Sequence, residues 1–150
     1  MRNLIENSVK LKDVCSALDV AVFKDFEIKF LQEFIECMQP VADALDRLQG
    51  DQHCFMADLI PTLLRTRDKL QSMSAKPLAY CLPLCTGLLK SLKHRFNDYM
   101  CLHEHVDEYI LAAVTDPYFK LRWVPWVTRV QELLLSRAAA QMKNVTGSAT

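Results

Sequence analysis

Apolar side chains between residues 25 and 49 recur at steps of three and four, and this stripe constrains the fold more than any other sequence feature. The spacing places these side chains on one face of an α-helix, which the rest of the chain must cover. The stripe consists of Phe26, Phe30, Phe34, Met38, Val41, Leu45 and Leu48. The charged residues fall largely off the stripe and are predicted to form a solvated face: Glu27, Lys29, Glu33, Glu36, Asp43, Asp46 and Arg47.

Proline and glycine mark the points where this helix should change. Pro40 removes one backbone donor and crowds the carbonyl group of Glu36, so we expect a kink there, or a break between two shorter helices. Gly50 is expected to end the run, because glycine commonly follows the last turn of a helix.

Five further segments show helical spacing of apolar residues, the first of them most weakly. They are residues 4–18, 55–73, 83–99, 106–113 and 127–142. Pro61 crosses the second, Pro83 suits the first turn of the third, and the Ser- and Pro-containing residues 72–77 read as a loop. Residues 144–150 are expected to fray. No segment alternates like a half-buried strand, so the sequence predicts an all-α fold, an irregular bundle of about five to six amphipathic helices.

Composition sets limits on domain number and on charge-driven function. The 150 residues are 51% hydrophobic, with three glycines and six prolines, which is typical of one folded domain spanning residues 1–150. Eighteen basic residues balance eighteen acidic ones. The protein therefore has no overall basic field, and any contact with nucleic acid must be local.

The six cysteines lie mostly in apolar, helix-like runs, where a free thiol behaves as a small buried hydrophobe. They are Cys15, Cys37, Cys54, Cys81, Cys85 and Cys101. We expect them to be reduced, because the first ten residues do not resemble a secretory signal and no apolar run approaches the ~20 residues of a membrane span. These patterns predict an intracellular protein that does not enter a membrane.

The densest group of potential metal ligands is Cys101, His103 and His105. Alternate spacing aims three side chains at one point only on an extended backbone, whereas a helix splays them by about 100° per step. Cys81 and Cys85 share a helical face, yet their spacing is not that of a zinc motif. Nothing pairs a nucleophile with a base or places two carboxylates in one pocket. The sequence predicts no catalytic residue, metal or cofactor; a metal-dependent enzyme built on the first group is the weakest alternative.

Lys90, Lys93 and Arg95 make the third long helix locally basic, and they are candidates for phosphate contacts. A solvated helix face is the competing interpretation, because the net charge is zero.

Asp116 and Pro117 are typical of a helix start. The aspartate accepts hydrogen bonds from free backbone donors, and proline needs no donor in the first turn. The segment predicts a helix with Phe119 and Trp123 packed inward and the basic residues between them facing outward.

Two segments resemble hAT-type DNA transposases and the BED-finger host proteins domesticated from them. Residues 112–120, AAVTDPYFK, resemble the family signature LDPRFK, with Thr115 in place of the usual Leu and Tyr118 in place of the usual Arg. Residues 38–50, MQPVADALDRLQG, followed by LIPTL at 59–63, resemble a second family pattern in the same order. The resemblance covers residues 25–125, and its motif positions are Pro40, Leu48, Gly50, Pro61, Asp116, Pro117, Phe119 and Lys120.

The resemblance implies a place in a larger architecture. In the family this region belongs to a helical insertion that supports DNA binding and assembly and interrupts a catalytic domain of RNase H type. The acidic metal ligands lie on that catalytic part, which has no counterpart here, and neither the amino-terminal BED finger nor the arginine-tryptophan motif has a match. The resemblance thus predicts a non-catalytic helical interaction module in the nucleus that binds protein partners or itself. The alternative is a helical domain that contacts DNA phosphates through its basic helix face.

Overall fold

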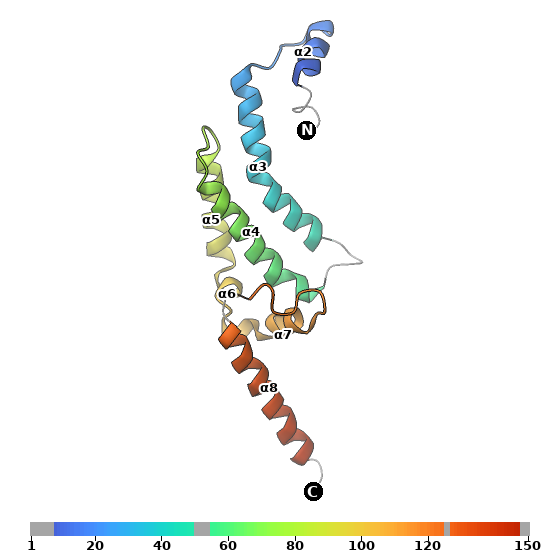
Figure 1. Ribbon diagram of the computed structural model, residues 1–150, viewed down its shortest axis with the longest axis vertical. Coiled ribbons are helices and arrows are strands. Elements are labelled where there is room, and N and C mark those ends of the chain that lie inside the picture. The colour runs from blue at the N-terminus through green and yellow to red at the C-terminus, as the bar shows by residue number, and fades with distance from the viewer. Residues whose placement is uncertain (1–7, 50–54, 125–126, 148–150) are drawn as a thin grey trace.

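The computed structural model describes residues 8–49, 55–124 and 127–147, and every regular element in them is helical (Figure 1). Within these ranges there are seven α-helices, two short 3-10 helices and no strand, which confirms the predicted all-α fold. In chain order they are α2 (Ser8–Ala17), α3 (Asp25–Leu48), η1 (Met56–Asp58), α4 (Leu59–Ser74), α5 (Leu82–Arg95), α6 (Asn97–Met100), η2 (Glu104–Val106), α7 (Asp107–Thr115) and α8 (Val127–Gly147).

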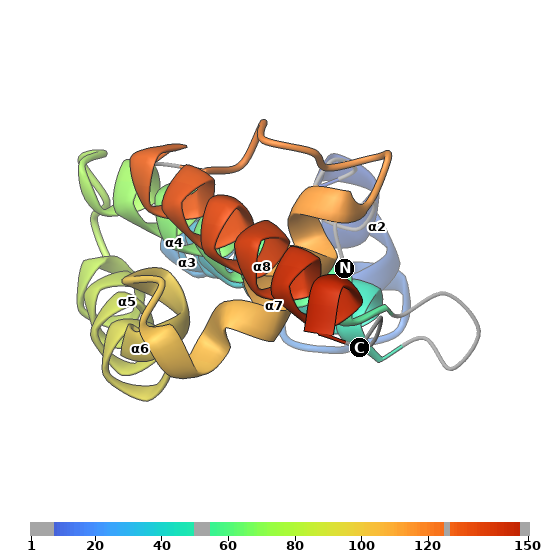
Figure 2. The same ribbon diagram turned by 90° about the horizontal axis from the view of Figure 1, so that it is seen from below.

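The helices form an elongated assembly rather than a round bundle. The central helix α4 packs against both α3 and α5, and its beginning lies against α7. In Figure 1, α2 and the start of α3 project at one end, and α8 projects at the other. Figure 2, seen from below, shows α8 running across the end of the molecule that α7 occupies.

Two apolar clusters hold the helices together, and α4 contributes to both. The first joins α4, α6, α7 and α8, and contains Ile60, Leu63, Leu64, Met100, Leu102, Val106, Ile110, Val130 and Leu133. The second joins α3, α4 and α5, and contains Cys37, Leu70, Met73, Cys81 and Cys85. Because the two clusters meet on one helix, displacement of α4 would disturb both.

The sequence locates most helices correctly and misses some of their ends. Pro83 lies in the first turn of α5, as predicted. Pro61 also falls within the first turns of α4, where a missing backbone donor costs little. However, α5 ends at Arg95 and a separate short helix follows, and α8 continues beyond Asn144 to Gly147. The expected loop begins only after Ser74.

The helix α3 passes through Pro40 without a break. Proline removes one backbone donor, and the carbonyl that loses its helical partner belongs to Glu36. Pro40 itself is buried, so packing of its ring offsets the lost hydrogen bond. The alternative of two shorter helices is therefore wrong. Gly50, expected to end the helix, lies outside the described residues.

Glu33 is buried, although its place off the apolar stripe predicted a solvated residue. Its carboxylate accepts backbone hydrogen bonds from Ala79 at 2.9 Å, Tyr80 at 2.8 Å and Cys81 at 3.0 Å. These donors precede α5, where the first backbone N–H groups of a helix lack partners. The carboxylate thus ties α3 to the start of α5.

Candidate functional site

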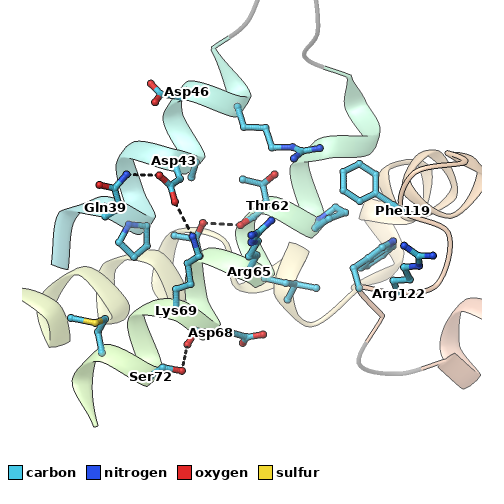
Figure 3. A pocket seen from close by; sticks show the side chains of 18 of the residues that line it. Gln39, Asp43, Asp46, Thr62, Arg65, Asp68, Lys69, Ser72, Phe119 and Arg122 are labelled. Carbon is cyan, nitrogen blue, oxygen red and sulfur yellow. Dashed lines mark hydrogen bonds and ion pairs between the residues drawn. The ribbon is translucent and has the colours of Figure 1, made fainter. Parts of the chain in front are cut away.

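An open groove of about 1500 Å³ lies between α3, α4 and the segment that follows α7 (Figure 3). Its walls bring together segments that are far apart in the sequence. Pro40 comes from α3, Pro61 from α4, and Phe119 from the segment after α7. Three of the eight residues that resemble the transposase patterns therefore meet around one surface feature.

The segment after α7 differs from its predicted form. Asp116 follows the last residue of α7 instead of starting a helix, and residues 117–123 form successive turns. Its side chain still accepts the backbone hydrogen bond of Tyr118 at 2.7 Å, and its carbonyl accepts that of Lys120 at 3.0 Å. Lys120 then adopts a left-handed conformation with φ of 50°, which helices of L-residues do not continue through. Asp116 thus accepts a backbone hydrogen bond as predicted, but the predicted helix start is wrong, because turns follow instead of a helix.

The burial of the side chains in this segment agrees with the prediction, although the backbone does not. Phe119 and Trp123 are partly buried, and Trp123 packs against the first apolar cluster. Lys120 and Arg122 are exposed. Pro117, beside Asp116, is also exposed.

Arg47 anchors this segment to α3. Its Nε donates to Asp58 Oδ1 at 2.7 Å, and its guanidinium lies 5.5 Å from the ring centre of Tyr118 and 5.1 Å from that of Phe119. Burial lowers the pKa of Arg47, but the hydrogen bond and charge of Asp58 outweigh that effect and raise the pKa above its ordinary value. The arginine was predicted to be solvated. Arg47 is instead partly buried, and its partners are ones that local periodicity does not reveal.

Asp58, which pairs with Arg47, is a residue of this site that the sequence did not predict. It is buried, and its second carboxylate oxygen accepts the backbone N–H of Phe55 at 3.2 Å. The three-residue spacing between Phe55 and Asp58 is the available sequence signal, because an acid at this offset commonly caps a helix start. This spacing can predict the hydrogen bond between Asp58 and the Phe55 backbone, but it cannot predict the ion pair between Asp58 and Arg47.

The α3 side of the groove carries charges that are already paired. Lys69 Nζ lies 2.8 Å from Asp43 Oδ2, and Gln39 donates to the other carboxylate oxygen (Figure 3). The hydrogen bond from Lys69, followed by that from Gln39, lowers the pKa of Asp43. Lys76 lies 3.9 Å from Glu36. Asp43 and Glu36 on this side of the groove are therefore already paired with lysines.

The other motif positions do not line the groove, or they lie outside the described residues. Leu48 is partly buried and is the last residue of α3. Gly50 falls in the undescribed residues 50–54.

The candidate phosphate contacts lie elsewhere, on α5. Lys90, Lys93 and Arg95 are all exposed, and they do not line the groove. Lys90 and Lys93 are three residues apart and share a helix face, but Arg95 is two residues beyond Lys93 and points to another side. Two of the three candidate phosphate contacts, Lys90 and Lys93, therefore lie on one face of α5.

Cys101, His103 and His105 lie at the turn between α6 and α7. His105 Nε2 is 3.0 Å from Asp98 Oδ2, and the His103 and His105 rings stack with centres 5.4 Å apart. The hydrogen bond from His105 lowers the pKa of Asp98. Among the described residues no three potential ligands are arranged to hold a metal ion.

Cys81 and Cys85 are buried with Cys37 between α3 and α5. Cys85 Sγ donates to the carbonyl of Leu70 at 3.3 Å. Burial raises the pKa of Cys37 to about 11 and also raises that of Cys81, which keeps both as unreactive thiols at neutral pH. All five cysteines in the described ranges are free.

None of the helices in the described part of the chain has the length and apolar character needed to cross a membrane.

Comparison with known proteins returns no match: no protein family, no curated protein and no solved structure is significantly similar to this chain. The relationship to hAT transposases stays a prediction that depends on the motif residues.

Proposed function

We propose that this chain is a transposase-derived helical module that acts in the nucleus without catalysis, by binding protein partners and in particular a second copy of itself. The transposase origin, the nuclear location and the lack of catalysis follow from the motif resemblance. The observation that supports protein binding is an apolar surface at the projecting start of α3.

The aromatic patch, defined as Phe23, Phe26, Phe30 and Tyr80, lies at this end of the molecule. Each of its side chains is between 41% and 52% exposed. Phe26 and Phe30 share one face of α3, and the rings of Phe30 and Tyr80 meet edge to face with centres 6.4 Å apart. Figure 1 shows the start of α3 reaching beyond the α4–α5 loop, so these helices leave it uncovered.

The apolar exposure extends from the aromatic patch toward α2. Its members are Val14, Leu18, Val20 and Val22, which are between 41% and 68% exposed. Together with the aromatic patch they concentrate exposed apolar side chains on α2 and the start of α3, and exposed apolar surface of this kind commonly marks a protein interaction site.

The charges around the aromatic patch favour a second copy as the partner. Lys24 and Lys29 lie beside Asp25 and Glu27, so both signs border the same aromatic side chains. In a two-fold symmetric interface the same surface of each copy packs against the other in the opposite direction. The lysines of one copy then lie opposite the acids of the other. A partner of uniform charge would meet repulsion on one side.

Self-association is tested with a Phe26→Glu substitution. The wild-type protein should sediment as a monomer–dimer mixture at micromolar concentration, and the substitution should weaken the dimer by about tenfold or more, since it places a charge in a desolvated contact. Leu135→Glu is the matched control, because Leu135 is 71% exposed on α8, at the other end of the molecule. Sedimentation velocity over a concentration series gives the dissociation constants. A wild-type protein that stays monomeric at about 100 µM would contradict self-association.

The absence of catalysis is tested separately. Incubation of the protein with DNA and magnesium or manganese ions should leave the DNA intact. Cleavage or joining that copurifies with the chain would overturn this part of the proposal.

The second candidate function is DNA binding through α5. It is favoured by Lys90 and Lys93, which share an exposed face and have no carboxylate partner among the described residues. Such lysines contact phosphates without reading sequence.

A gel-shift series distinguishes this candidate from the first. If α5 binds DNA, changing Lys90 and Lys93 together to glutamate should lower the affinity about tenfold or more and reduce the salt dependence by about one unit of slope for each lost contact. Arg95→Glu should have a smaller effect because its side chain points elsewhere. Arg137→Glu on α8 is the control. Binding that is absent, or unchanged in the double variant, removes the candidate.

A further inference from the structure

The helix α2 is an arm that lies outside the core. No described residue of α2 belongs to either apolar cluster, and residues 16–26, which lead from it into α3, are all exposed. An ion pair between Lys12 Nζ and Asp25 Oδ1 at 2.9 Å links the arm to α3. Because these side chains are 45% and 91% exposed, the pair contributes little to stability. The arm is therefore held loosely and can adjust its position against a partner.

An apolar stripe runs along α2 and is called the arm stripe. It consists of Leu11, Val14, Cys15 and Leu18, which recur at steps of three and four and so share one face. Leu18 continues the helical turn, because its backbone N–H donates to the carbonyl of Val14 at 3.0 Å. Cys15 is buried, whereas Val14 and Leu18 are both more than half exposed. One edge of the arm stripe is therefore open to a partner.

The open edge of the arm stripe and the aromatic patch have the same spacing. Val14 and Leu18 are four residues apart, and Phe26 and Phe30 on α3 are also four residues apart. Side chains at this spacing form a ridge along a helix, and the commonest class of helix contact packs such ridges of one helix between those of another. The aliphatic edge of α2 therefore suits a helix-to-helix contact with the aromatic face of α3.

The arm does not cover the aromatic patch of its own chain. All four side chains of the patch stay exposed, although α2 lies at the same end of the molecule (Figure 1). In that view α2 projects beyond the start of α3. A second copy that approaches in the opposite direction brings its own arm alongside the exposed start of α3. The same two-fold operation places the first arm on the patch of the second copy.

We propose that α2 of each copy packs on the aromatic patch of the other copy, so that two equivalent arm-to-patch contacts close a two-fold dimer. This inference rests on the proposed self-association and specifies which segment of the partner occupies the patch. The competing arrangement pairs patch with patch and stripe with stripe. The arm-to-patch arrangement places an aliphatic ridge against aromatic rings in both contacts and leaves neither arm projecting into water.

Two variants with defects in different halves of the contact distinguish these arrangements. The arm variant carries Val14→Gln and Leu18→Gln, and the patch variant carries Phe23→Gln and Phe26→Gln. All four positions are exposed, so the fold should tolerate the changes, which circular dichroism checks. Glutamine adds no charge, so the variants do not attract each other electrostatically. Each variant alone should dimerise at least about tenfold more weakly than the wild type, because both of its contacts contain a defective half.

A mixture of the two variants gives the deciding measurement. A mixed dimer joins the intact arm of one variant to the intact patch of the other, which preserves one complete contact. Its second contact joins two defective halves, which lose little more together than either loses alone, because residues in contact are not additive. After correction for statistical weight, the mixed dimer should bind about fivefold or more tightly than the geometric mean of the two homodimers. Native mass spectrometry over a concentration series separates the three dimers by mass.

The controls separate failure of this inference from failure of self-association. Leu135→Gln on α8, mixed with the patch variant, should give a mixed dimer at the geometric mean, because Leu135 lies at the other end of the molecule. If the arm and patch variants also give a mixed dimer at the mean or weaker, or if either dimerises like the wild type, the arm-to-patch contact is overturned while self-association stands. A wild-type protein that is monomeric at about 100 µM overturns both.

Discussion

Replacing Glu33 by glutamine should lower the midpoint of thermal unfolding by roughly 5 °C or more, since buried charge-assisted hydrogen bonds are lost and a chain of this size responds by a few degrees per bond. The carboxylate accepts three backbone N–H groups from residues 79–81. An amide offers one oxygen in their place and turns an N–H₂ group toward the remaining donors. Calorimetry or circular dichroism measures the midpoint.

A matched control and the pH dependence make this prediction specific. Glu36→Gln changes an exposed glutamate on the same helix and should shift the midpoint little. Burial raises the pKa of Glu33, but the hydrogen bonds from Tyr80, Ala79 and Cys81 outweigh burial and lower it below the ordinary value.

A lowered folded-state pKa means that this stabilisation is complete above the ordinary pKa of a glutamate. It is lost as the pH falls through the lower folded-state value. The midpoints of wild type and Glu33→Gln should therefore differ at neutral pH and converge in acid. A constant difference at all pH values would contradict the assignment of the effect to this carboxylate.

Replacing Asp58 by asparagine should destabilise the fold by about 2 kcal/mol, the cost of losing hydrogen bonds to a charged group in a partly buried site. Asp58 holds Arg47 through a 2.7 Å contact and also accepts the Phe55 backbone N–H. Its side chain is 6% exposed, whereas that of Arg47 is 37% exposed, so the arginine regains some hydration and the loss stays below that of a fully buried pair.

Asp46→Asn is the matched control for this second prediction, because it makes the same change at an exposed position one residue before Arg47. Urea unfolding followed by circular dichroism gives the free energies. The Asp58 variant should also loosen Tyr118 and Phe119, whose rings lie against Arg47, which faster proteolysis within residues 116–124 would detect. Equal stability of the two variants would contradict a structural role for the pair.

The helices were predictable because their signal is local. The three- and four-residue spacing of Phe26, Phe30 and Phe34 specifies a helix whatever lies against it, and Pro83 marks a first turn by its own geometry. The hydrogen bond that the Asp116 side chain accepts from the backbone N–H of Tyr118 was predictable for the same reason. The left-handed Lys120 that stops the following helix was not, because no residue type there requires it.

The candidate groove could not be predicted from local signals. Its walls come from three segments, α3, α4 and residues 118–123, so the groove exists only after these segments pack together. Proximity of Pro40, Pro61 and Phe119 could be suspected only from their shared resemblance to one family.

By itself the sequence determined that the chain is helical, roughly where most helices begin, and which side chains form their apolar faces, because these depend on periods of three and four residues. Only the tertiary structure decided that Glu33 is buried, that Arg47 pairs with Asp58, and that Arg65 and Arg122 share a groove. Those outcomes depend on partners 11 to 48 residues away for the first two, and further for the third. Such partners are brought together by long-range packing, through burial and charge. The periodicity of apolar residues along the chain depends only on local spacing and cannot predict them.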